Sequence, residues 1–181
     1  MKLAIAALLL SVIPATAAEI YDFGVLPAGG AIAGGPGSTI GWGYSIQNES
    51  TSLWLVTTGL DMSVFQHGTP NLLLDFPAIA PGGSVTVPFD DVGGTGLAEI
   101  TWDSSAPAGY EASGNFHLSA EWWNGDPLVN GNFLSTAPVG VQAYDATVVA
   151  AATPEPATMS LISLPLIAVG LLRGRRNRSR P

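Results

Sequence analysis

The sequence has 181 residues, a formal net charge of −8 and no cysteine. All six basic residues lie in the terminal segments, whereas all fourteen acidic residues lie between Glu19 and Glu155. Such a body repels polyanions and has no cation that could displace the counterions of a phosphate backbone, which excludes nucleic-acid binding. The absence of cysteine excludes both disulfides and a thiol nucleophile, so stability must come from an apolar core.

The N-terminal segment has the composition of a secretory signal peptide. Met1-Lys2 is followed by an apolar stretch over 3–13 and then by small residues. Ala15 and Ala17 form the Ala-x-Ala pattern of a cleavage site, and Ala18 is the next choice. The alternative, an uncleaved anchor, requires about 20 apolar residues to cross a bilayer, more than this stretch provides. We therefore expect 1–18 to be a signal helix, read by the export machinery and signal peptidase.

The C-terminal segment combines three features. The motif Pro154-Glu155-Pro156 is held extended by its prolines. An apolar run over 159–172 would span about 21 Å as a helix, and basic side chains can extend its reach by snorkelling. Basic residues after a final span keep that end in the cytoplasm, so the preceding domain would be outside. These basic residues are Arg173, Arg175, Arg176, Arg178 and Arg180.

This order of motif, apolar run and arginine-rich end resembles the PEP-CTERM sorting signal of Gram-negative bacteria, over 153–181. Two features depart from the usual pattern, Thr153 before the first proline and Pro165 within the apolar run. The resemblance implies that exosortase, a membrane-embedded transpeptidase-like enzyme, cuts near the motif, and that the protein accompanies extracellular polysaccharide. The alternative is an ordinary C-terminal membrane anchor behind a proline-rich linker.

The region 19–152 is predicted to be one all-β domain. No segment there repeats apolar residues with a helical period, whereas several alternate with period two between Gly, Pro, Asn and Asp turns. This pattern predicts a β-sandwich of seven or eight strands, immunoglobulin- or fibronectin-like as the first choice and a jelly roll as the second. Pro88 indicates an edge strand or a bulge. The expected strands cover 40–46, 53–58, 62–65, 72–76, 84–89, 97–102, 115–123 and 139–149, and they follow a Gly- and Pro-rich segment with one short apolar stretch at 20–26.

The alternation over 116–122 predicts a strand with His117, Ser119 and Glu121 on its solvent face. His117 and Glu121 would lie about 13–14 Å apart at their Cα atoms, too far to bind one metal ion. His67 is the only other histidine, and the sequence contains neither a nucleophile elbow nor a His-Glu-x-x-His motif. We therefore expect no catalytic residues, and a hydrolase is only the third hypothesis.

Two weaker motifs occur in predicted turns. Asp90 and Asp91 precede a glycine-rich stretch and could hold Ca²⁺ with backbone carbonyls, but no spaced calcium-loop motif is present, and a solvated turn is the preferred interpretation. No other cofactor or metal is expected. Asn48-Glu49-Ser50 has the pattern of a glycosylation acceptor, a weak indication because the tail is bacterial in type.

The five tryptophans are the most informative side chains of the middle region. Trp54, Trp102 and Trp122 occupy apolar phases of their strands, so we expect them in the core. Trp123, together with Trp42 or Tyr44, could be exposed and stack on a sugar ring.

These features predict a secreted protein of the cell surface or extracellular matrix with a structural or adhesive role and no enzymatic activity. It would be held transiently in the inner membrane through its C-terminal helix alone and passed to exosortase. The alternative function is that of a carbohydrate-binding module acting on exopolysaccharide.

Overall fold

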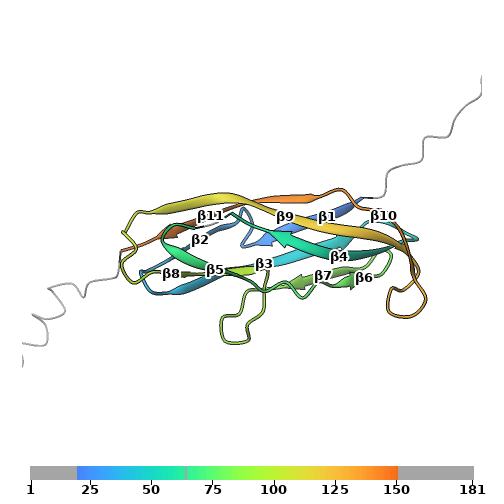
Figure 1. The fold of residues 1–181 in the computed structure, drawn as a ribbon, viewed down its shortest axis with the longest axis horizontal. Helices are drawn as coiled ribbons and strands as arrows, with labels where there is room; N and C mark the ends of the chain where they lie inside the picture. The colour runs from blue at the N-terminus through green and yellow to red at the C-terminus, as the bar shows by residue number, and fades with distance from the viewer. Residues whose placement is uncertain (1–19, 64, 151–181) are drawn as a thin grey trace, which may run out of the picture.

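The computed structural model describes residues 20–63 and 65–150. In these residues the chain contains strands and no helix, and two sheets pack together as a β-sandwich (Figure 1). Several strands are only two to five residues long, so the strands outnumber the seven or eight predicted. They are β1 (Tyr21–Leu26), β2 (Ala31–Gly34), β3 (Thr39–Asn48), β4 (Trp54–Asp61), β5 (Gly68–Leu72), β6 (Ala78–Ile79), β7 (Ser84–Val87), β8 (Ala98–Trp102), β9 (Glu111–Asn124), β10 (Asn132–Thr136) and β11 (Gly140–Val148).

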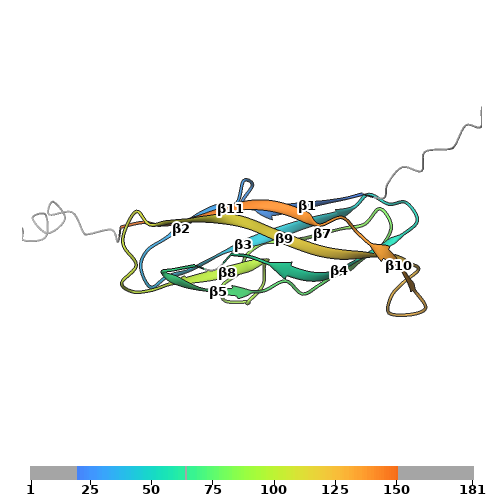
Figure 2. The same ribbon diagram turned by 45° about the horizontal axis from the view of Figure 1, so that its top comes forward.

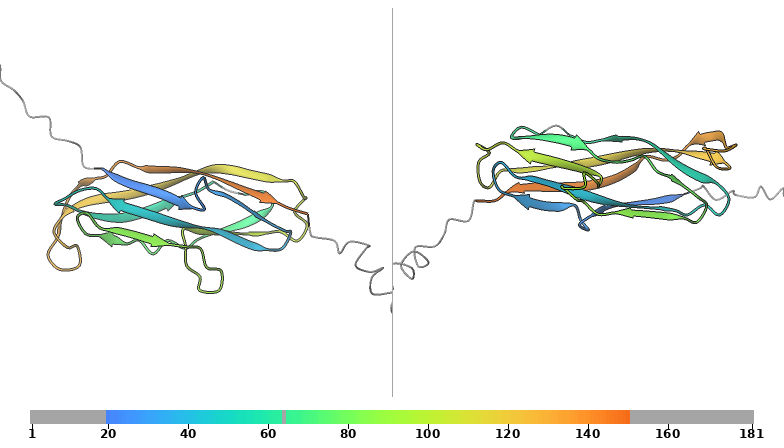
Figure 3. Two further views of the ribbon diagram at one scale, coloured as in Figure 1. Left: turned by 180° about the vertical axis from the view of Figure 1, so that it is seen from behind. Right: turned by 90° about the horizontal axis from the view of Figure 1, so that it is seen from below.

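The smaller sheet has the order β1-β3-β8-β5, with β7 also paired to β3. All its pairs are antiparallel. β3 organises this sheet, because one half of it pairs with β8 and the other half pairs with β1 and β7. Figure 3 shows β1 beside β3 when the molecule is seen from behind.

The larger sheet has the order β2-β11-β9-β4-β6, with β10 also paired to β9. β9 is its longest strand and lies between β11 and β4 (Figure 2). β2 runs parallel to β11, and the other pairs are antiparallel. The beginning of β9 pairs with β11 and its end pairs with β10, so β10 lies at one end of the molecule.

The described chain begins and ends at opposite ends of the long axis (Figure 1). It enters β1 at the end where β10 lies and leaves after β11 at the other end. The register agrees, since Thr147 near the end of β11 pairs with Glu111 at the start of β9.

The core is built on the alternation of large residues and glycine in β3. Trp42, Tyr44 and Ile46 are buried between the sheets. Gly43 points the other way, toward the end of β7 and the residues that follow it, and an added Cβ there would be 2.5 Å from the Val87 carbonyl oxygen. The position therefore has room only for glycine.

Aromatic rings fill the centre of the core. The Trp42 ring is 5.2 Å from that of Phe116 and 5.3 Å from that of Tyr144, between ring centroids. Its Nε1 donates a 2.7 Å hydrogen bond to the Gly30 carbonyl. The expected core positions of Trp102 and Trp122 are confirmed, because both side chains are buried.

Some expected strands are displaced. Residues 62, 63 and 65 are not in a strand, and β5 replaces the strand expected at 72–76. β5 contains Pro70 and, among the described residues, pairs only with β8, so the missing proline amide is not needed by a second neighbour. The edge position inferred from Pro88 is confirmed for β7, which ends at Val87 and pairs with β3 alone in the described part.

Asn48 is fully buried at the end of β3. Its Nδ2 donates to the carbonyls of Leu53, Ile79 and Ala80 at 2.8–3.1 Å, and its Oδ1 accepts from the Ser50 amide. This amide is therefore a hydrogen-bonding hub, and in the folded chain it cannot take the glycan suggested by the acceptor pattern.

Candidate functional site

The outer face of β9 has the side-chain pattern that the sequence predicts. Phe116, Leu118, Ala120 and Trp122 are buried, whereas His117 and Ser119 are exposed and Glu121 is partly exposed. Trp123 follows Trp122 and is partly exposed on the outer side. The polar face of this strand therefore ends in an aromatic side chain.

Three aromatic residues of adjacent strands are neighbours in the register at this end of the sheet. In the register, Trp123 of β9 is directly opposite Trp54 of β4 on one side and Phe133 of β10 on the other. Residues directly opposite in antiparallel strands have Cβ atoms about 4.5–5.5 Å apart. Trp54 and Trp123 are partly exposed and Phe133 is 51% exposed. We refer to Trp54, Trp123 and Phe133 as the aromatic row.

The row has a defined geometry at Trp123. The Phe133 ring stands at 79° to the Trp123 ring, with 6.4 Å between centroids, so the two rings form a corner. The Trp123 Nε1 donates a 3.0 Å hydrogen bond to Oε2 of Glu121, two residues earlier on the same face. This bond restrains the indole and satisfies its polar atom at the surface.

The structure corrects two predictions about the tryptophans. Trp54 is not a core residue, because β4 buries the side chain of Leu55 and so turns Trp54 outward. Trp42 and Tyr44 are fully buried because β3 turns its large side chains inward, so neither can present a face to a sugar. Of the three residues predicted to contact sugar, only Trp123 is on an accessible face.

Further exposed apolar side chains occur on the neighbouring strands and in the loop that joins β9 to β10. Val56, partly exposed, is opposite Glu121 in the neighbouring strand, and Leu134 of β10 is half exposed. Leu128 and Val129 are well exposed in the loop between β9 and β10. Apolar exposure of this extent, rimmed by polar residues, is typical of a binding surface.

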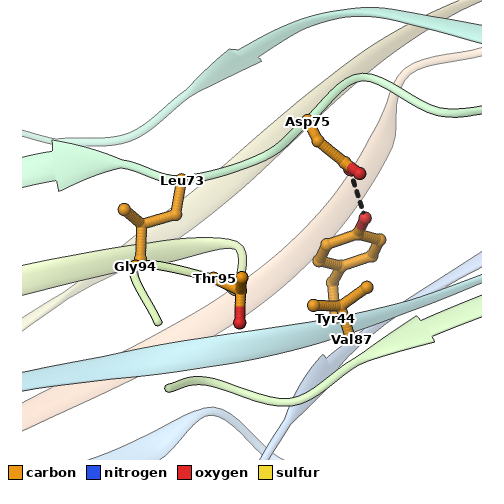
Figure 4. A pocket seen from close by; sticks show the side chains of 7 residues that line it. Tyr44, Leu73, Asp75, Val87, Gly94 and Thr95 are labelled. Atoms are coloured by element: carbon orange, nitrogen blue, oxygen red, sulfur yellow. Dashed lines mark hydrogen bonds between the residues drawn. The ribbon is translucent and has the colours of Figure 1, made fainter. Parts of the chain in front are cut away.

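A small cavity of about 130 Å³ lies elsewhere, at the smaller sheet (Figure 4). Its polar centre is the Tyr44 hydroxyl, which donates a 2.6 Å hydrogen bond to Oδ1 of Asp75. The remaining wall is provided by Leu73, Val87, Gly94, Thr95 and Gly96, of which only Thr95 has a polar side chain. The cavity has one charged group and is smaller than most ligand pockets.

The contact with Asp75 predicts how stability depends on alkaline pH. Burial raises the pKa of Tyr44 above its ordinary value, and the hydrogen bond and charge of Asp75 raise this pKa further. The unfolded chain loses the same proton near pH 10, so above that pH unfolding releases a proton and stability falls. We expect Tyr44 to contribute up to about 1.4 kcal/mol per pH unit to this fall.

Urea unfolding of wild type and Tyr44→Phe between about pH 9 and pH 11.5 measures this contribution. The stability advantage of wild type should be present below pH 10 and shrink above it. If the free energies of unfolding of the two proteins fell in parallel with pH, Tyr44 would not contribute to the loss of stability.

Within the part of the chain that the structure describes, no group of three or more His, Asp or Glu side chains could hold a metal ion. Asp90 Oδ1 accepts the Val92 amide and thereby caps its own turn. The His67 ring packs edge-on against Tyr110, 4.7 Å between centroids. These residues have local structural roles.

The proposed processing sites lie outside the described residues. This holds for Ala15, Ala17 and Ala18, for Pro154-Glu155-Pro156 and for the five C-terminal arginines. Within 20–63 and 65–150, no helix is long and apolar enough to cross a membrane.

Comparison of the chain with models of known protein families and with curated proteins found no match. Function is therefore inferred from the chemistry of the aromatic row. An aromatic corner with an adjacent carboxylate can stack on an apolar ring face and accept hydrogen bonds from hydroxyl groups at the ring's edge. The alternation of β9 pointed to Trp123, but no sequence signal identified Phe133 or the outward phase of Trp54.

Proposed function

We propose that the mature protein is a secreted, non-catalytic adhesive protein of the cell surface or extracellular matrix, and that its aromatic row binds polysaccharide. The observation that carries this proposal is the position of Trp54, Trp123 and Phe133 side by side on three strands of an outer sheet face. Aromatic side chains contribute large contact areas and are normally buried. Keeping three of them at the surface is favourable where a ligand covers them.

The chemistry of a sugar matches the row. One face of a pyranose ring is rich in C–H groups and can stack on indole, while its edge carries hydroxyl donors. The Trp123 ring offers the stacking surface, Phe133 provides a wall at 79° to it, and Glu121 provides an acceptor beside it. If the row binds polysaccharide in this way, the adhesive role and the carbohydrate-binding role are the same function.

Export and sorting are part of the proposal and rest on the two terminal segments. We propose that signal peptidase removes 1–18 and that exosortase reads Pro154-Glu155-Pro156 after the C-terminal helix has held the chain in the inner membrane. The supporting observations are the apolar stretches, the Ala-x-Ala pattern and the terminal arginines.

We also propose that the sandwich is of the immunoglobulin or fibronectin type. The pairing order β1-β3-β8-β5 corresponds to A-B-E-D, and β11-β9-β4 corresponds to G-F-C of that class. The position of β6 departs from it, because this short strand follows β5 in the chain but pairs with β4.

Glycan binding is tested with the exported protein purified from cells that express the full chain. We expect saturable binding to at least one polysaccharide on a glycan array, and Trp123→Ala should weaken it at least about tenfold, which equals about 1.4 kcal/mol. Trp54→Ala should also weaken it. Phe76→Ala is the matched control, since Phe76 is an exposed aromatic outside the row. Equal losses for Phe76→Ala and Trp123→Ala, or no binding by wild type, would refute the proposal.

Processing is tested by the intact mass of the protein recovered from the producing bacterium. The expected mass lacks the first 17 or 18 residues and the segment beyond the Pro154-Glu155-Pro156 region. Recovery of a chain that still ends at Pro181 would rule out cleavage by exosortase.

A further inference from the structure

We propose that the aromatic row selects uncharged sugars and excludes acidic polysaccharides, and that Glu121 is the residue that sets this selectivity. This inference rests on the proposed function and adds the class of ligand. It follows from three properties of the row, namely the position of Glu121, the sign of the surrounding charge and the hydrogen-bonding capacity of the carboxylate.

Glu121 lies beside the ring on which a sugar would stack. Its Oε2 is 3.0 Å from Nε1 of Trp123, and in the register it faces Val56 on one side and Thr136 on the other. A sugar stacked on Trp123 would therefore have its edge near this carboxylate. A uronate or sulfate group on such a sugar would place two negative charges close together on a surface partly shielded from water, which is unfavourable.

Residues 19–152 contain no Lys or Arg side chain that could offset this repulsion, so a bound acidic sugar has no such side chain with which to form an ion pair. In the register Asp61 of β4 is opposite His117, four residues before Glu121 on the same face, and its carboxylate adds to the negative potential.

The carboxylate suits a ligand that carries hydroxyl groups. An ionised carboxylate only accepts hydrogen bonds and has about four acceptor positions. In the described part of the chain, the Trp123 indole is the only side chain that donates to Glu121. The remaining capacity can accept hydroxyl donors of a neutral sugar, and hydrogen bonds to a charged acceptor are stronger than those between neutral groups.

The test measures binding of the exported protein to two neutral polymers, a soluble β-glucan and a xylan, and to two acidic ones, polygalacturonate and alginate. Salt is set at about 0.01 M and about 1 M, where the Debye length is about 30 Å and 3 Å. We expect similar affinity for a neutral polymer at both salt concentrations and at least about tenfold weaker binding of the acidic polymers at low salt.

The variant Glu121→Gln removes the charge and keeps an oxygen that can accept the Trp123 indole. It should strengthen binding of the acidic polymers at low salt about tenfold and weaken binding of the neutral polymers, because hydrogen bonds to an amide oxygen are weaker than those to a carboxylate. Glu111→Gln is the matched control, because it removes the same charge from the same strand, about 33 Å further along at its other end. We expect Glu111→Gln to change neither the affinity for the acidic polymers nor the affinity for the neutral ones.

The possible failures are distinct. If an acidic polymer binds wild type at least as tightly as the neutral ones and Trp123→Ala abolishes that binding, the selectivity is overturned and the glycan-binding function stands. Equal effects of Glu121→Gln and Glu111→Gln would overturn the role of Glu121. If no polymer binds, the proposed function and the inference both fail.

Discussion

Replacing Trp42 with alanine is expected to lower the free energy of unfolding by about 3–5 kcal/mol. The side chain is fully buried and contacts the Phe116 and Tyr144 rings at the centre of the core. The substitution also removes the indole donor of the buried Gly30 carbonyl, which then keeps, within the described residues, only its hydrogen bond from the Asp145 amide. Domains of this size have about 5–15 kcal/mol of stability, so the loss would be a large part of the total.

Equilibrium unfolding in urea measures this change. Trp42→Phe is an intermediate case, because it keeps an aromatic ring in the core but removes the indole donor and the extra ring volume of indole, for an expected cost of about 1–3 kcal/mol. A loss below about 1 kcal/mol for Trp42→Ala would show that the core does not depend on this residue. It would also reopen the possibility that Trp42 is accessible to a ligand.

Replacing Asn48 with alanine should have the second-largest effect on stability. The substitution removes one side chain that joins three carbonyls and one amide from separate segments. Each buried group left without a partner costs about 1–3 kcal/mol, and local backbone adjustment can recover part of that cost. We therefore expect a loss of about 3–4 kcal/mol in urea unfolding. Asn71→Ala is the matched control, because Asn71 is an exposed amide bonded only to Glu99 in the described part.

Asn48→Asp provides a second test with a characteristic pH dependence. Its carboxylate would face three carbonyl oxygens and have no donor to offer them, so its pKa in the folded state should rise above the unfolded value of about 3.9. The variant should therefore lose stability relative to wild type as the pH rises above about 4. A difference between the two proteins that does not vary with pH would contradict the hub at Asn48.

The accuracy of the sequence predictions depended on whether one face of a strand is clearly polar. In β9, polar residues alternate with apolar ones over most of its length, which fixed its inner face and the exposure of His117 and Ser119. In β4, Trp54, Leu55 and Val56 are all apolar, so apolar side chains point to both faces of the strand. The sequence therefore did not show which face is packed into the core. Apolar residues on both faces are expected where the outer face has a function, and the aromatic row is formed there.

Other differences arose from long-range packing. Trp42 and Tyr44 alternate with glycines, which alone does not show which side of β3 is covered. The segment after β7 packs closely against the glycine side of β3. The large side chains of β3 fill the core on its opposite side. β10 was not predicted because all five of its residues are exposed and show no alternation. Its pairing partner, β9, is what identifies it as a strand.

The opposite placement of the two ends has a mechanical consequence. Trp123 is near the end of β9, whereas the chain leaves β11 beside the start of β9, about 40 Å away along the strand. If the C-terminal segment tethers the protein and the aromatic row grips a polysaccharide, tension pulls β9 and β11 in opposite directions along their common axis. Their hydrogen bonds are perpendicular to the strands, so the ladder from Gly140 to Thr147 is loaded in shear and its bonds share the force together instead of opening one after another.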